Sequence, residues 1–316
     1  MKKLMLPVKL TLPIIILILL IFSADAARES CASALDLCGR MIIPSLFPFF
    51  VLSAFINKLA LPGLIGRLIA PIISRLYGIS PAGASALPIG FIGGYPAGAA
   101  YIADMESEGL VSGEEAERLL AFCNNSGPAF IVGVMGGAVF ASAELGLKLY
   151  AVHIFSSMTA GLFFRKGYNP SPIAPHRLDS TGTAQAVVAS VKQATGSIIN
   201  VCGFVICFSV FVSLLHSCGL FGLLCGMLSG LGLDTKLCEA ILTGILELGS
   251  GAGAMQGMAP SRINLSFAAA MLGWGGLSVH FQTLAVLAGS KIKGTLHLAG
   301  RLLCAVISFI TMYLIF

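Results

Sequence analysis

The sequence predicts an all-α polytopic membrane protein built from two inverted repeats that contain re-entrant or discontinuous helices. Three observations predict this fold: an apolar composition, several windows long enough to cross a bilayer, and similar motifs that recur in the same order. Of the 316 residues, 57% are hydrophobic and 10% are charged, and the mean hydropathy is +0.93. A soluble domain carries roughly 25% charged residues, which it needs to cover its core. Most of the chain therefore has lipid as its solvent.

Apolar segments of about 20 residues are long enough to span a hydrocarbon core of roughly 30 Å. Candidate spans are 10–24, 33–56, 82–103, 119–141, 146–164, 195–216, 236–256, 264–289 and 295–316. The apolar stretches 60–77 and 219–231 are too short to span, and 60–77 is expected to lie along the membrane surface.

The chain divides into four parts. Residues 1–29 are an N-terminal transmembrane helix or a signal peptide, since a basic start, an apolar run and a small-residue cleavage pattern fit both. We favour retention, because a membrane protein follows. Residues 30–164 form a first repeat, 165–192 a polar and proline-rich cytoplasmic linker, and 193–316 a second repeat.

Matching motifs predict the duplication. "GFIGGYPAGA" at 90–99 corresponds to "GILELGSGAGA" at 244–254, and "NNSGPAF" at 124–130 corresponds to "GWGGLSV" at 273–279. The apolar segment 146–164 likewise corresponds to 294–312. Glycine and alanine make each match weak, but the shared order and nearly constant offset favour an internal repeat.

Loop charges predict the direction of each crossing, because basic loops favour the cytoplasm. The acidic segment 104–118 is expected outside, and the basic linker inside together with Arg262, Lys291 and Lys293. This arrangement requires 119–141 and 264–289 to enter and leave the membrane on one face. Each half then makes three full crossings, an odd number, so the repeats are inverted, as in many secondary transporters.

Polar residues interrupt the first repeat twice. In "GGYPAG" the proline removes a backbone donor, so Tyr95 and Pro96 mark either an unwound solute-binding segment or a simple kink with close packing. Asn124, Asn125 and Ser126 sit in "NNSGP", where freed backbone groups must line a protein-enclosed or wet cavity. They are candidate solute ligands; the alternative is that the amides cap the half-helices and satisfy each other.

The second repeat carries a carboxylate within the membrane. Glu247 is a candidate proton- or ion-coupling residue, because charged groups at membrane depth usually mark pathways; the alternative is a structural, hydrogen-bonded role. Ser250 follows in the same motif as a candidate ligand. Ser278 and Gln282 are further candidate ligands, and His280 is a candidate coupling residue. These three side chains share a face only if the backbone there is extended.

The sequence excludes several other classes of function. The nine cysteines form no CxxC pair or metal-binding spacing, and enzyme motifs such as a P-loop, HExxH or a nucleophile elbow are missing from the sequence. We therefore expect no enzyme, metal, cofactor or nucleic-acid partner, but a bilayer and a small solute. A homo-oligomer is left open.

The motifs "GFIGGYPAGA", "GLVSGEEAERLLAFCNNSGPAFIVG" and "GWGGLSVHFQ" resemble those of YlbJ-type sporulation integral membrane proteins, of the nucleoside-recognition (Gate) domain group. The resemblance covers roughly residues 30–316. It implies transport of dipicolinate across the membrane that surrounds the forespore during endospore formation. By position it implicates Tyr95, Pro96, Asn124, Asn125, Ser126, Glu247 and Gln282.

The resemblance leaves alternatives. Leu248, Gly249 and Ser250 replace a Thr-Asn-Gly-like stretch, which leaves the substrate open, and the Gate group also suggests a nucleoside. A non-transporting assembly or morphogenesis protein is a further alternative. For a dianion, half-helix N-termini and side-chain amides would supply the donors, since the sequence is expected to place no lysine or arginine in the membrane near the breaks.

Overall fold

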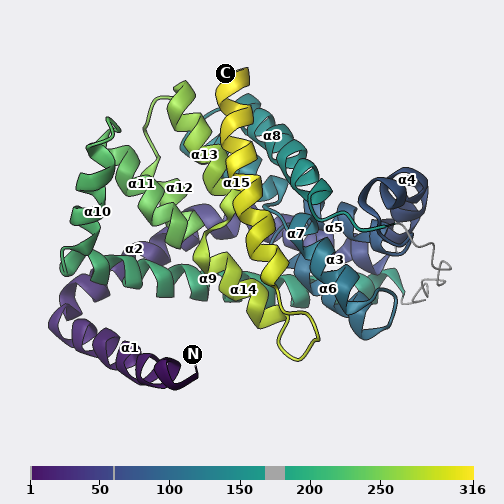
Figure 1. Cartoon of the computed structure of the whole chain (residues 1–316), viewed down its shortest axis with the longest axis horizontal. Coiled ribbons are helices and arrows are strands. Elements are labelled where there is room, and N and C mark those ends of the chain that lie inside the picture. The colour runs from purple at the N-terminus through teal and green to yellow at the C-terminus, as the bar shows by residue number, and fades with distance from the viewer. Residues whose placement is uncertain (1, 60, 168–181) are drawn as a thin grey trace.

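The structure is a computed structural model that describes residues 2–59, 61–167 and 182–316, and its regular elements in these ranges are helices (Figure 1). Three of the described helical stretches are long and apolar enough to cross a membrane: Ala24–Ile56, Thr183–Ser217 and Thr295–Ile315. Much of the predicted linker, 168–181, lies outside the described residues.

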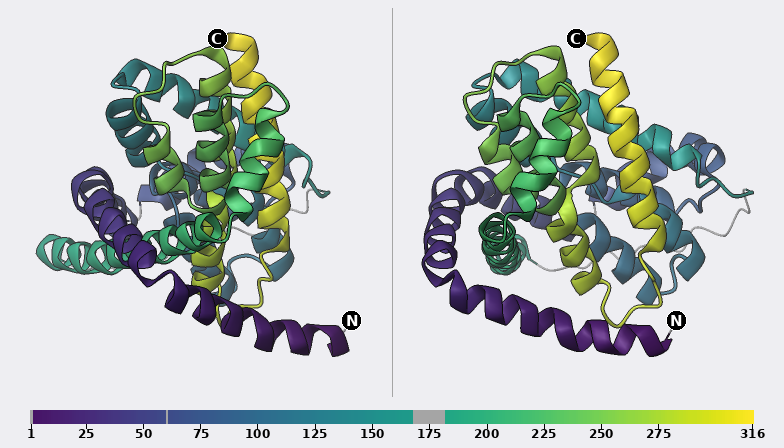
Figure 2. Two further views of the ribbon diagram at one scale, coloured as in Figure 1. Left: turned by 90° about the vertical axis from the view of Figure 1, so that its left-hand side faces the viewer. Right: turned by 60° about the vertical axis from the view of Figure 1, so that its left-hand side comes forward.

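The first elements lead from the periphery into the bundle. Helix α1 (Lys2–Phe22) contacts α2 and otherwise lies apart from the bundle (Figures 1 and 2). Helix α2 (Ala24–Leu37), the π-helix η1 (Cys38–Ile42) and α3 (Ile43–Lys58) follow without a break. Helix α4 (Leu61–Tyr77) exposes one apolar face and packs on the short η2 (Gly83–Ser85), which fits the surface helix expected at 60–77.

Helices α5 (Ala86–Ile92) and α6 (Ala97–Ser107) double back on each other around Gly93–Pro96. Helix α7 (Gly113–Cys123), a break and the π-helix η3 (Ala129–Val139) then run antiparallel to α8 (Ala143–Leu162). Ser157 donates to the Phe122 carbonyl at one end, and Gly136 meets Gly146 at the other. Ser157 and Gly146 of α8 are roughly 16 Å apart along the helix axis, because each helical residue adds about 1.5 Å. The segment 119–141 therefore traverses the bundle once.

The second half repeats this plan. Helix α9 (Thr183–Ser217) packs on α2 and α3, and the short α10 (Leu220–Ser229) follows it. Helices α11 (Thr235–Leu246) and α12 (Leu248–Ala254) double back, so that Gly244 lies against Gly251.

Helices α13 (Arg262–Trp274) and α14 (Gly276–Val286) run antiparallel to α15 (Thr295–Ile315), as Figure 1 shows. Arg262 lies 5.4 Å from the Tyr313 ring centre at one end, and His280 lies 5.1 Å from His297 at the other. The segment 264–289 is therefore also a single traverse.

The expected re-entrant segments are thus corrected. The hairpins are 86–107 and 235–254, whereas 119–141 and 264–289, predicted to be re-entrant, are discontinuous helices that cross. Paired glycines let α11 and α12 approach closely at their turn, while the polar breaks interrupt a helix without reversing it. In each half one segment changes from re-entrant to crossing and another from crossing to re-entrant, so the number of crossings stays odd. The inference of inverted repeats therefore does not change.

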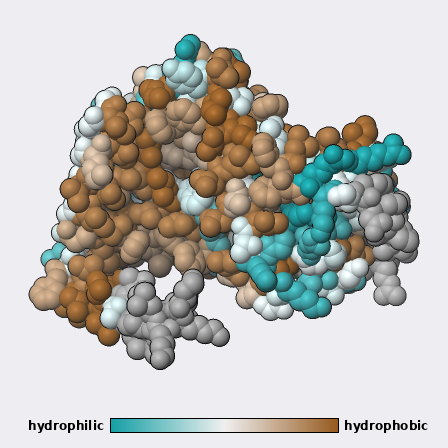
Figure 3. Space-filling view, in the orientation of Figure 1, coloured by the Kyte–Doolittle hydropathy of each residue, from teal (hydrophilic) through white to brown (hydrophobic). Residues whose placement is uncertain are grey.

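The expectation that the acidic segment and the basic linker lie on opposite faces is also wrong, and so is the expectation that Arg262 shares a face with Lys291 and Lys293. Glu114 pairs with Lys166 at the start of the linker, and Glu117 accepts backbone N–H groups of Lys293 and Gly294. The acidic segment therefore lies at the same end of the bundle as these basic groups, while Arg262 lies at the other end of α15. Basic residues dominate the sidedness rule, and acidic residues contribute little to it. Figure 3 shows the hydrophilic surface gathered around α4, α6 and α7, next to a broad hydrophobic surface.

Candidate transport site

Two hairpin tips, the first helix break and helix α14, which begins at the second break, meet around one cavity. Its volume is about 60 Å³, and helices α3 and α9 close its sides. Tip and break residues that line it are Gly93, Gly94, Tyr95, Ser126, Gly127, Ala129, Phe130, Glu247, Leu248, Gly249, Val279 and Gln282. Elements far apart in sequence and related by the duplication therefore build a common chamber.

Glycines allow each hairpin tip to lie directly on the neighbouring break. A Cβ at Gly94 (φ +71°) would come within 2.9 Å of the Gly127 nitrogen. A Cβ at Gly276 (φ +82°) would come within 2.9 Å of the Leu248 nitrogen. Both contacts are backbone to backbone, so a larger residue at either glycine would push the tip away from the break.

Glu247 joins two elements at the cavity. It caps α12, since its carboxylate oxygens accept the N–H groups of Gly249 (3.0 Å) and Ser250, and it accepts a hydrogen bond from the Ser278 hydroxyl (3.3 Å). The side chain is 2% exposed. An acidic side chain that caps a helix satisfies the free N–H donors at the helix start. The Glu247 carboxylate is therefore held by hydrogen bonds within the protein, although Glu247 also lines the cavity.

The two asparagines of the first break bind protein groups. Asn124 donates to the Thr283 hydroxyl (3.0 Å) and accepts from the Ala99 N–H (3.2 Å), so it connects α6 to α14. Asn125 donates to the Phe122 carbonyl (2.7 Å), and its side-chain oxygen accepts from Ser157 (2.6 Å). Asn124 and Asn125 are not among the cavity-lining residues. The geometry is closer to the structural alternative, but the amides bond to other protein groups and do not satisfy each other as that alternative expected.

Three other predicted residues do line it. Ser126 is buried, and its hydroxyl has no hydrogen-bond partner among the residues that the structure describes. The ring of Tyr95 forms another part of the wall, and Gln282 of α14 forms a third. These three residues, which carry a phenol, a hydroxyl and an amide, line one small chamber.

The remaining candidates lie outside the central cavity. Pro96 lines a smaller neighbouring one of about 30 Å³. Ser250 lines a larger cavity of about 480 Å³ between α2, α9 and α12, with its hydroxyl 2.8 Å from that of Ser209. The backbone at 278–282 is helical, so Ser278 and Gln282 share a face while His280 turns away to Trp274 (4.4 Å between ring centres).

Sequence reasoning missed Arg301, and the expectation of no membrane-embedded cation near the breaks is wrong. This side chain is fully buried in α15 and donates to the Asn125 side-chain oxygen (2.6 Å), the Ala121 carbonyl (2.9 Å) and the Ser157 hydroxyl (2.8 Å). The signal was present in the sequence: a single arginine in the middle of the apolar span 295–316.

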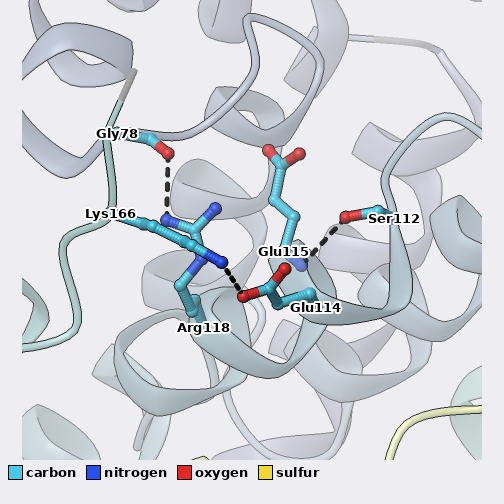
Figure 4. A network of polar contacts seen from close by, with 6 residues as sticks. All are labelled: Gly78, Ser112, Glu114, Glu115, Arg118 and Lys166. Carbon is cyan, nitrogen blue, oxygen red and sulfur yellow. Dashed lines mark hydrogen bonds and ion pairs between the residues drawn. The ribbon is translucent and has the colours of Figure 1, made fainter. Parts of the chain in front are cut away.

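The acidic motif at the start of α7 makes several polar contacts (Figure 4). Ser112 caps the helix, Arg118 donates to the Gly78 carbonyl (2.9 Å), and Glu115 accepts the Ser80 N–H (2.6 Å). Lys166, through its hydrogen bond, holds the pKa of Glu114 below its ordinary value. The motif thus anchors α7 to two other segments of the chain.

No family model matches the chain. The chain is 29% identical over 308 residues to the sporulation integral membrane protein YlbJ of Bacillus subtilis (strain 168), an alignment that covers 88% of this chain and 75% of that protein. It is a homologue of this integral, multi-pass membrane protein, as the motifs had indicated.

The fold is similar to that of CNTnw, solved in an inward-facing, substrate-bound state. The TM-score is 0.53 with 13% sequence identity, and the match covers 98% of this chain and 87% of CNTnw. The chain therefore has the CNT-like fold, which contains inverted repeats with re-entrant hairpins, and the predicted fold class is confirmed.

Proposed function

We propose that this protein is a secondary transporter for a small polar or anionic solute, with dipicolinate during endospore formation as the leading candidate. One observation carries the proposal: both hairpin tips, the first helix break and the start of α14 beyond the second break converge on the cavity that contains Tyr95, Ser126, Glu247 and Gln282. Broken helices at a repeat interface expose backbone groups that bind a solute. Homology to a sporulation integral membrane protein supports a role in endospore formation.

The chemistry of the wall suits a flat, polar ring compound. Ser126 and Gln282 offer hydrogen bonds, and Tyr95 offers an aromatic face. The cavity of about 60 Å³ is well below the roughly 300 Å³ of small ligand sites. We therefore infer that the structure is a contracted state, and that the hairpin tips separate from the breaks when solute enters.

Glu247 is the proposed coupling residue. It is the acidic side chain among the residues that line the cavity, and its hydrogen bonds reach α12 and α14 together. Loss or gain of a proton or cation at this carboxylate would change the contact between tip and break. His280 lies one residue layer away, against His297 and Trp274, and is a proposed secondary proton site.

A nucleoside is the second candidate solute, because the motifs resemble the nucleoside-recognition (Gate) group and the fold is similar to that of CNTnw, solved with a substrate bound. Both solutes present a flat ring and several hydrogen-bonding groups. They differ in charge, since dipicolinate is a dianion and nucleosides are neutral.

Uptake of labelled dipicolinate into liposomes that contain the purified protein tests the proposal, with nucleosides as competitors. We expect saturable uptake that a Ser126→Ala, Gln282→Ala double variant loses at normal protein levels. Ser217→Ala, at an exposed hydroxyl near the end of α9, is the matched control and should transport normally.

Two results would contradict the proposal. Uptake of neither solute class by correctly folded protein removes the transport function. Full biological activity after substitution of Asn124, Asn125 and Glu247 would favour the assembly or morphogenesis role instead.

A further inference from the structure

Arg301 is a buried cation without a compensating charge. Its guanidinium is fully buried, and its hydrogen bonds go to a side-chain amide, a carbonyl and a hydroxyl, all of them neutral. Among the described residues, the ion pairs join other side chains, none of them Arg301. Burying an unpaired charge is unfavourable, so a buried charge is usually paired.

Unpartnered polar atoms surround this guanidinium. They are Arg301 Nε, both ring nitrogens of His153 and of His280, and His297 Nε2, while the Tyr95 hydroxyl interacts with the guanidinium itself. Arg301 acts electrostatically on Tyr95 and on these histidines. Imidazole is neutral or cationic, so the histidines cannot neutralise the arginine. Folded proteins leave few buried polar atoms unsatisfied, so several such atoms around one buried cation need a functional explanation.

Tyr95 and Asn125 connect the cluster to the cavity. The ring of Tyr95 lines the cavity, while its hydroxyl is within the electrostatic reach of Arg301. Asn125, which accepts a hydrogen bond from Arg301, directly precedes Ser126 in the cavity wall. The positive charge therefore lies one residue layer behind the wall formed by Tyr95 and Ser126.

We propose that Arg301 is the specificity-determining residue that provides the positive charge for a carboxylate-bearing solute at the Tyr95 and Ser126 wall. The proposal rests on the proposed transport function and narrows its substrate class to anions. It also resolves a conflict in the site, because Glu247 alone would repel an anion, whereas the guanidinium offsets that repulsion. Arg301 acts through the wall residues and is a positioning residue in this sense.

Binding of two isosteres to the purified protein tests the proposal. Dipicolinate is a dianion, and pyridine-2,6-dicarboxamide has the same ring and shape without charge. We expect the wild-type protein to bind the dianion roughly tenfold or more tightly than the diamide, as expected for a nearby charge in a partly desolvated site. Arg301→Gln should lose this preference while still binding the diamide, and Arg301→Lys should retain part of it.

Arg262→Gln is the matched control, since this arginine lies over Tyr313 at the far end of α15 and should leave the preference unchanged. Equal binding of both compounds by the wild-type protein would overturn the proposal without any variant, even if Arg301→Gln does not fold. A preference that persists in Arg301→Gln would also overturn it, while the transport function would stand. Binding of neither compound would remove dipicolinate as the solute, and this inference with it.

Discussion

The carboxylate of Glu247 faces the cavity and caps α12 at once, so its two roles can be separated by substitution. Glu247→Ala removes the acceptor of the Gly249 and Ser250 N–H groups, and we expect a loss of about 1–2 kcal/mol of stability, as for other lost caps. Glu247→Gln keeps one acceptor oxygen and should fold better. Thermal unfolding of the two purified variants compares these stabilities.

Transport by Glu247→Gln then tests the coupling role. We expect uptake driven by a proton or ion gradient to be lost, while exchange of solute across the membrane continues, because the amide cannot gain or lose a proton near neutral pH. Gradient-driven uptake at the wild-type rate in Glu247→Gln would rule out obligatory proton release from this side chain.

At the residue scale, sequence predicted the type of group in the site better than its orientation. Tyr95, Ser126, Glu247 and Gln282 were identified because polar groups in an apolar span must face protein or water, and all four line the cavity. Asn124 and Asn125 turn away from it because the direction of a side chain at a helix break depends on backbone angles that sequence does not specify. Arg301 was missed because it lies in an intact helix, where no polar break marks the position.

At the element scale, glycines set how closely helices approach. A Cβ at Gly300 in α15 would lie 2.1 Å from the Ala121 carbonyl oxygen of α7. We expect Gly300→Ala to push the two helices apart and to lower stability by roughly 1–3 kcal/mol, the usual cost of overpacking. The shift would also disturb Arg301, one residue further along α15.

Gly226→Ala in α10 is the matched control, because nothing lies within 4 Å of the new methyl group. Alanine favours helix over glycine by about 1 kcal/mol, so this variant should be as stable as the wild type or slightly more stable. Unfolding measured by heat or denaturant in detergent compares the two. Equal stability of both variants would contradict the close packing of α7 and α15.

Hairpins and crossings could not be told apart from the sequence. Segments 82–103 and 119–141 are both apolar and similar in length, so hydropathy allowed either to be re-entrant. Tertiary contacts distinguish the two kinds of segment. Gly244 meets Gly251 within one hairpin, whereas the broken helices lie along α8 and α15. The order of matching motifs was sufficient for the duplication, because it does not depend on which segment turns back.

At the scale of the whole molecule, the two repeats meet at one end through α7 and the loop before α15. A Cβ at Gly113 would lie 4.0 Å from the Cβ of Lys291, within the range of a disulfide. In a background without the native cysteines, Gly113→Cys combined with Lys291→Cys should form a bond under mild oxidation. Electrophoretic mobility before and after reduction detects it.

Gly113→Cys with Arg262→Cys is the control, because Arg262 lies at the opposite end of α15 and should not react. The sidedness expected from loop charge alone would place residues 113 and 291 on opposite faces of the membrane. That topology would also place Arg262 opposite residue 113, so it predicts no bond in either pair. A missing Gly113–Lys291 bond would therefore contradict the structure and support that topology.

The central claim is that solute occupies the chamber between the hairpin tips and the helix breaks. Protection of a cavity cysteine tests it most directly: Ser126→Cys, in a background without the native cysteines, is alkylated in liposomes with and without dipicolinate or a nucleoside. We predict that the transported solute slows alkylation in proportion to its occupancy, because the Ser126 side chain lines the chamber. Alkylation that stays equally fast in saturating solute, in liposomes that transport this solute, would contradict the account.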